Sequence, residues 1–175
     1  TDEEFMSYNM RRTAPPSFGH LSEDNMLELI NLCSEDVTHV NFSGGSDNVI
    51  TQRVVVHLLK KLPNIASLNL ANCHGITADT LKPIGLYGKK MERLDLSGRK
   101  DFGGFGTYSF YKMFQELPSL KCLKVDLHSD GLYSSHLKKL AQCCPKLELL
   151  NLCGQQSSDA LDLTPLLVGC KNLRG

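Results

Sequence analysis

Apolar residues return in a fixed six-residue pattern along most of the chain. Large apolar residues occupy the first, fourth and sixth positions of the segments VTHVNF, IASLNL, MERLDL, LKCLKV and LELLNL. These segments begin at residues 37, 65, 91, 120 and 147, a partial copy begins at 173, and the starts are 28, 26, 29, 27 and 26 residues apart. Because strand side chains alternate between two faces, each segment predicts a short strand with its fourth and sixth residues buried.

A stretch with helical spacing follows each predicted strand. In ITQRVVVHLLKKL, apolar residues between positions 54 and 62 recur on one helical face. Similar stretches are ITADTLKPIGL, TYSFYKMFQEL and SSHLKKLAQCC, for which Thr77 and Ser134 are the expected caps of two helices. Proline at positions 63, 118 and 145 stands two residues before a strand segment, where it ends the helix.

Strand–turn–helix units of this length are typical of leucine-rich repeats. We therefore predict an α/β leucine-rich repeat solenoid, with a curved parallel sheet on the concave side and helices on the convex side. Residues 1–20 are expected to form an irregular extension, residues 21–36 an N-terminal cap helix, and residues 37–175 about five repeats. Because an open repeat edge needs cover, we expect either a longer protein or a partner at the C-terminal edge.

The repeat also explains most of the seven cysteines. Cys144 and Cys170 stand three residues before a strand segment, where other repeats have leucine, so we expect both to fill the core as small apolar side chains. Cys73 stands at the ninth position, where these repeats carry Asn or Cys at the corner after the strand. With no C-x-x-C pair, no metal and no cofactor are expected. The odd count favours a reducing compartment, the cytoplasm or nucleus.

Two stretches resemble the cysteine-containing leucine-rich repeats of F-box-type ubiquitin-ligase receptors and their relatives. They are LNLANCHGITADTL (residues 68–81) and LAQCCPKLELLNLCG (residues 140–154). Over a shorter stretch, LDLSGRK (residues 94–100) is similar to repeats of Zyg-11-type receptors, which work with cullin-2 and elongins. In both families the repeats hold a substrate and a separate box recruits the ligase. Residues 18–33 resemble the first helix of an F-box, or form the cap of the first repeat.

The third, fifth and seventh positions of each strand segment are predicted to face the concave surface. The expected partner-binding residues on this face are His39, Asn41, Asn69, Arg93, Asp95, Lys124, Asp126, Leu149 and Asn151. The asparagines offer hydrogen bonds to a peptide, and Arg93 matches a carboxylate or phosphate. The alternative is that these side chains only solvate the sheet, with Arg93 and Lys124 neutralising Asp95 and Asp126 across strands.

A glycine-rich segment, SGRKDFGGFGTYSF (residues 97–110), lies in the longest repeat. It lacks the G-x-x-x-x-G-K-[ST] spacing of a phosphate-binding loop. We expect either a bulge at the corner of the repeat or a partner-binding loop on the rim, with Arg99, Phe102 and Phe105 as contacts. Packing of the two phenylalanines in the core is the alternative.

Charge and composition narrow the function. The chain has 19 basic and 19 acidic residues, so it lacks the excess positive charge that favours nucleic acid or an anionic membrane, and neither is an expected partner. Six histidines are scattered over the repeats, and the geometry forces no nucleophile, base and orienting group together. We expect a non-enzymatic module that binds a protein or peptide, as the substrate-recognition part of a cullin-type ubiquitin ligase. The alternative is a scaffold or assembly adaptor unrelated to ubiquitin.

Overall fold

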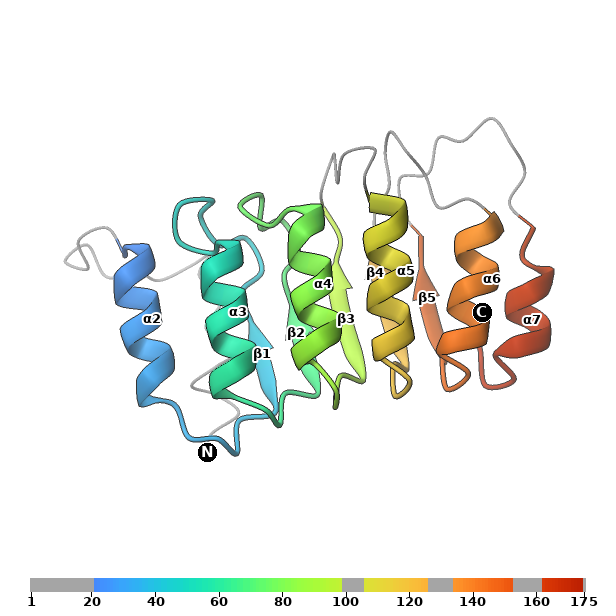
Figure 1. The fold of residues 1–175 in the computed structure, drawn as a ribbon, viewed down its shortest axis with the longest axis horizontal. Helices are drawn as coiled ribbons and strands as arrows, with labels where there is room; N and C mark the ends of the chain where they lie inside the picture. Colours follow the sequence, from blue (N-terminus) through green and yellow to red (C-terminus); the bar gives the residue numbers. More distant parts are fainter. Residues whose placement is uncertain (1–20, 99–105, 126–133, 153–161, 175) are drawn as a thin grey trace.

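Helices and strands alternate along the chain, and successive repeats follow one another from one end of the molecule to the other (Figure 1). The computed structural model describes residues 21–98, 106–125, 134–152 and 162–174. The elements in chain order are α2 (Glu23–Leu32), β1 (His39–Asn41), α3 (Gln52–Lys61), β2 (Ser67–Asn69), α4 (Ala78–Tyr87), β3 (Arg93–Leu96), α5 (Gly106–Glu116), β4 (Cys122–Val125), α6 (Ser134–Cys143), β5 (Leu149–Asn151) and α7 (Thr164–Gly169).

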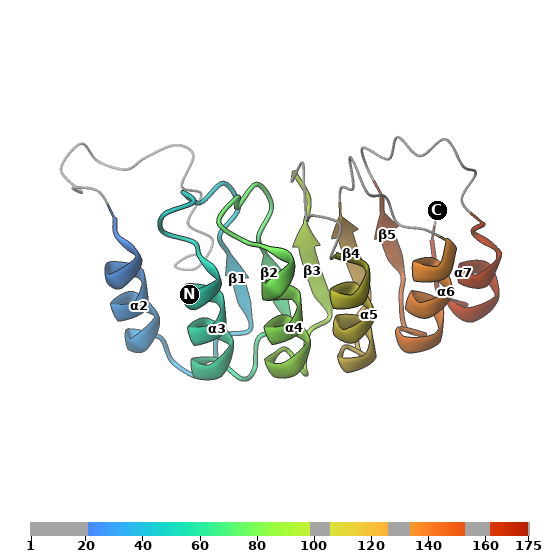
Figure 2. The same cartoon turned by 45° about the horizontal axis from the view of Figure 1, so that its top comes forward.

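The strands form one parallel sheet in the order β1-β2-β3-β4-β5. The helices form a second layer that covers one face of this sheet (Figure 2). The register pairs equivalent residues of successive repeats: Val40 with Leu68, Leu68 with Leu94, Leu94 with Leu123, and Leu123 with Leu150. The predicted α/β repeat solenoid with a parallel sheet is therefore confirmed, and the six-residue pattern located its strands.

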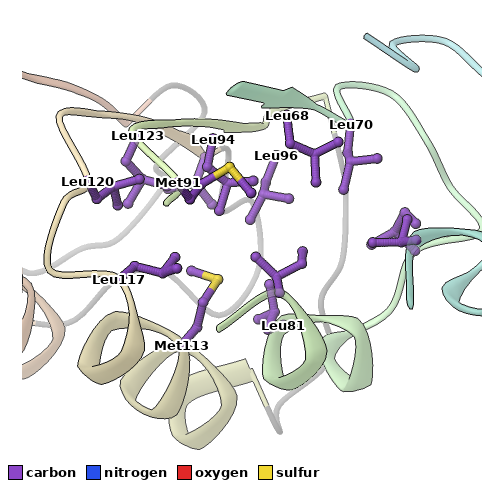
Figure 3. Packing of buried hydrophobic residues seen from close by; sticks show 14 of the residues in the cluster. Leu68, Leu70, Leu81, Met91, Leu94, Leu96, Met113, Leu117, Leu120 and Leu123 are labelled. Atoms are coloured by element: carbon purple, nitrogen blue, oxygen red, sulfur yellow. The ribbon is translucent and has the colours of Figure 1, made fainter. Parts of the chain in front are cut away.

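The core lies between the two layers, and the apolar positions of the pattern fill it. Leu68, Leu94 and Leu123 are each at most 1% exposed. Met113 and Leu117, at the helix layer, face the strand residues across this core (Figure 3). Parallel strands separated by helices bury a continuous apolar layer in this way, and each repeat covers its neighbour.

Residues with hydroxyl side chains lie at the N-termini of several helices. Thr77 is the N-cap residue of α4 as predicted, and its backbone N–H donates to the Thr80 hydroxyl over 3.3 Å. Residues 126–133 lie outside the described chain, so the cap role of Ser134, the first described residue of α6, stays a prediction; its hydroxyl accepts a hydrogen bond from the Asp162 backbone N–H. The sequence reasoning missed Ser22, which caps α2 through a reciprocal pair of hydrogen bonds with Asn25.

The strand ladder continues past β5. The Arg174 backbone N–H donates to the Glu148 carbonyl over 2.8 Å, just as the Glu148 N–H donates to the Lys121 carbonyl one repeat earlier. Leu173 is half-buried and packs against the core. The partial sixth segment thus takes the register of the preceding five.

Helix α2 lies within residues 21–36, the range expected for a cap. Its buried side chains, Met26 and Ile30, join the common core. Glu23 at its start accepts hydrogen bonds from the Thr51 hydroxyl and from Arg53, and these hydrogen bonds, chiefly the one from Thr51, lower the pKa of the Glu23 carboxyl. These contacts join α2 to the start of α3.

Candidate functional site

The outer face of the sheet, turned away from the helices, brings together most of the predicted partner-binding residues. Residues at equivalent positions of the repeats form two rows that cross all five strands. They are called the third row and the fifth row, after the third and fifth positions of the six-residue pattern. The third row comprises His39, Ser67, Arg93, Cys122 and Leu149. The fifth row comprises Asn41, Asn69, Asp95, Lys124 and Asn151. Neighbours within a row are about 4.8 Å apart, the spacing of paired strands, so one ligand can contact several of them.

The structure does not test four of the predicted binding residues, one expected on this face and three expected on the rim loop. Asp126, Arg99, Phe102 and Phe105 lie outside the described residues. At the seventh position the prediction fails for Ala71, which is only 8% exposed. The chain has already left the strand there, so strict alternation no longer applies.

Three fifth-row side chains serve the turn that follows their own strand. Asn41 accepts a hydrogen bond from the Ser43 backbone N–H, and Asn69 accepts one from Ala71, each over 2.9 Å. Asp95 accepts two, from the Ser97 backbone N–H and from the Ser97 hydroxyl. One oxygen of each is therefore committed to a local turn, a role that Asn and Asp often take and that the sequence reasoning overlooked.

The charged side chains of β3 and β4 form two cross-strand pairs. Lys124 Nζ lies 3.4 Å from Asp95 Oδ2 in the fifth row, which confirms the expected neutralisation of Asp95. Where the strands begin, Lys121 Nζ lies 2.9 Å from Glu92 Oε2, and this hydrogen bond lowers the pKa of the Glu92 carboxyl. The two pairs cancel four of the five charges on residues 92–96 and 121–125, which are the two strands and the residue before each.

Arg93 carries the fifth charge, and it adds to the larger effect of Lys121 in lowering the pKa of the Glu92 carboxyl. The expected partner Asp126 is outside the described part of the chain, and among the described residues Arg93 makes no ion pair. The other third-row positions are His39, Ser67, Cys122 and Leu149, none of them a carboxylate. Arg93 is exposed, so its guanidinium is available to an approaching anion.

The third row becomes apolar toward β5. Cys122 is half-buried beside Arg93, and Leu149 is 43% exposed on the next strand. Burial raises the pKa of the Cys122 thiol, against the smaller opposing effects of Lys124 and Arg93. The thiol therefore stays protonated at neutral pH and behaves as a weakly polar surface.

Three other cysteines support the interpretation that thiols fill the core. Cys73, Cys144 and Cys170 are each at most 2% exposed, as predicted from their repeat positions. The Cys73 thiol donates to the Phe42 carbonyl over 2.9 Å, which ties the corner of one repeat to the strand of the previous one. In the part of the chain that the structure describes, no group of three His, Cys, Asp or Glu side chains could hold a metal ion.

A depression of about 490 Å³ lies where the first strands begin. Its lining residues are Asp36, Thr38, Asn64, Ala66, Lys89, Lys90, Glu92 and Ser119. Lys89 pairs with Glu116, Lys90 donates to Asn64, and Glu92 pairs with Lys121. Because these polar groups are already engaged with one another, the depression is a weaker candidate site than the third row.

The fold and its outer face define a repeat solenoid of alternating strands and helices. A solved structure with a similar fold is described as "Leiomodin-1 Actin-Binding Site 2 (ABS2)", with a TM-score of 0.59 and 18% sequence identity. The match covers 91% of this chain and 90% of that chain. No family model and no curated protein matches the sequence. Within the described residues, no helix is long and apolar enough to cross a membrane.

Proposed function

We propose that the chain is a non-enzymatic protein-interaction module that binds its partner on the outer face of the sheet. The observation that carries this proposal is the third row, where an exposed arginine without an ion pair in the described chain stands two strands from an exposed leucine. Arginine is enriched at interface centres, and the buried centre of an interface is more apolar than the rest of a protein surface. Extended faces of this kind are the binding surfaces of solenoid proteins.

The described histidines support a non-enzymatic role. His39 contacts Thr38, His57 contacts Asn31, and His136 is buried against Tyr111. His39 and His57 belong to the first repeat, His136 lies on α6, and His74 is exposed in the turn before α4. A binding module in a reducing compartment, the cytoplasm or nucleus, remains the proposal, supported by the protonated, core-filling cysteines.

The specific form of the proposal is the substrate-recognition part of a cullin-type ubiquitin ligase. Its support is the resemblance of residues 68–81 and 140–154 to repeats of F-box-type receptors. In this form the outer face holds the substrate and a region outside the described repeats recruits the ligase adaptor.

A scaffold or assembly adaptor is the second candidate. The similar structure of leiomodin-1 is named as an actin-binding site. A fold of this kind therefore forms a site that is named as actin-binding in that protein.

Affinity purification of the full chain from cells tests these proposals. The wild type is compared with a double variant, Arg93→Glu with Lys124→Glu, and with Lys138→Glu plus Lys112→Glu on the helix layer as a control of equal charge change. The proposal expects partners that the sheet-face variant loses and the control retains. Recovery of a cullin with its adaptor supports the ligase form, whereas actin or other structural proteins without a cullin support the scaffold. Equal recovery by all three proteins contradicts binding on this face.

A further inference from the structure

The charge pattern of the outer face indicates which kind of segment fits it. At the edge of the sheet where the strands begin, Glu92, Lys121, Glu148 and Arg174 alternate in sign along successive repeats, and Glu92 pairs with Lys121. In the fifth row, Asp95 and Lys124 form a neutral pair. Within the two rows the acidic and basic residues are Arg93, Asp95 and Lys124, so Arg93 is the surplus charge there, and the surplus is positive.

We propose that the third row binds an acidic peptide segment, with a carboxylate on Arg93 and an apolar side chain on Cys122 and Leu149. This inference rests on the proposed function and names the partner's chemistry. One guanidinium presents two parallel N–H donors that match one carboxylate. A phosphate carries up to two charges and calls for a second cation, but the neighbouring Lys121 and Lys124 are already paired.

The polar groups nearby strengthen this preference for an anion. The oxygens of Asn41 and Asn69 that accept turn hydrogen bonds are occupied, and both oxygens of Asp95 are engaged by Ser97 and Lys124. A basic side chain would meet Arg93 and find no unpaired carboxylate in the two rows. A carboxylate meets the surplus charge directly.

Row geometry sets the spacing within the peptide. Arg93, Cys122 and Leu149 lie on three successive strands, so the two end positions are about 9.6 Å apart. A polyproline-type extended peptide brings side chains three residues apart onto one side, at a distance of about 9.3 Å. The acidic and the apolar residue of the bound segment therefore stand three positions apart.

Selection from a displayed library of random twelve-residue peptides on the full chain tests the inference. The expected result is enrichment of peptides with Asp or Glu three positions from Leu, Ile, Val, Met or Phe. Absence of enriched peptides, or enrichment of peptides without an acidic residue, overturns it. Circular dichroism melting confirms that each variant below is folded.

Binding of the most enriched peptide, labelled with fluorescein, is then measured by anisotropy. Loss of a charge-assisted contact predicts at least about a tenfold weaker affinity for Arg93→Gln, a larger loss for Arg93→Glu, and an intermediate loss for Arg93→Lys. Lys138→Glu on α6 is the matched control and keeps the wild-type affinity. Added salt weakens wild-type binding more than binding to Arg93→Gln. Equal affinities for wild type and Arg93→Glu contradict the inference.

One further variant separates this inference from the broader proposal. Ser67→Trp places a large side chain in the third row one strand from Arg93. If peptide binding survives Arg93→Glu but is lost in Ser67→Trp, the outer face is the interaction surface and the acidic preference is wrong. If neither substitution matters, both the inference and the outer-face proposal fail.

Discussion

A left-handed residue turns the chain after each of the first three strands. Gly44, Asn72 and Gly98 occupy the eighth position of successive repeats, with φ angles of 72°, 57° and 76°. Only glycine and, less readily, asparagine adopt this conformation at low cost. The sequence predicted a corner at Cys73, but not that the preceding residue, Asn72, has a positive φ angle. Gly and Asn have different side chains, so their shared backbone conformation is not evident from the sequence alone.

Replacing Gly98 tests the corner. A Cβ at this position would stand 2.1 Å from Asn72 Oδ1, and the backbone is left-handed, so we expect Gly98→Ala to lower the free energy of unfolding by about 1–3 kcal/mol. Urea denaturation measures the loss. In an Asn72→Gly background the steric part disappears and a smaller loss remains. A stability equal to that of the wild type would contradict the corner geometry.

Buried thiols are the residue-scale feature that the sequence predicted best. Cys144 takes the place of a leucine, and its side chain packs against the Phe114 and Leu117 carbonyls. Burial, with smaller effects of Cys143 and Cys170, raises the pKa of the Cys144 thiol from 9.0 to about 12. The repeat slot revealed the burial, and burial determines the direction of the pKa shift.

This shift predicts a pH dependence of stability. The unfolded chain loses the Cys144 proton near pH 9.0 and the folded chain near pH 12, so the folded state holds more protons between them. The contribution is complete below pH 9.0 and is lost as the pH rises toward 12. Urea denaturation at about pH 8 and about pH 10 should show a smaller decline for Cys144→Ala than for the wild type. Cys143→Ala, at a half-exposed position, is the control, and equal declines for Cys144→Ala and the wild type would refute the linkage.

At the scale of elements, the local sequence pattern predicted the strands, whereas contacts between distant residues stabilise the helices. The six-residue pattern fixed which strand residues face the core. Helix α4 keeps its place despite Pro83, because Leu81 and Ile84 on its inner face are fully buried. The hydrogen bond between Thr51 and Glu23 joins residues 28 positions apart, so no local spacing could predict it.

Equivalent strand residues should differ in their contribution to stability. Leu94 is 1% exposed in the central strand, whereas Leu150 is half-buried in β5. Leu94→Ala is expected to lower the free energy of unfolding by about 2–5 kcal/mol, because it leaves a cavity in a packed core. Leu150→Ala should cost at least about 1 kcal/mol less, because less apolar surface is lost there. Chemical denaturation of both variants checks this order, and a larger loss for Leu150→Ala would contradict it.

At the scale of the molecule, the repeat predicted which residues share the outer face of the sheet, but not how the charges on that face are arranged. The pattern placed Arg93, Asp95 and Lys124 on one face because strand alternation is a backbone property. It could not choose between pairing and binding, since that choice depends on side-chain distances. In the structure Lys124 pairs with Asp95, whereas Arg93 makes no ion pair within the described chain.

The most direct test of the account is photo-crosslinking in cells from two positions on opposite layers. A photoreactive amino acid replaces Ser67 on the outer face of the sheet, or Lys138 on helix α6. If the outer face is the interaction surface, irradiation should join protein partners to position 67 and far fewer to position 138. Adducts from position 138 alone, or equal adducts from both, would contradict it.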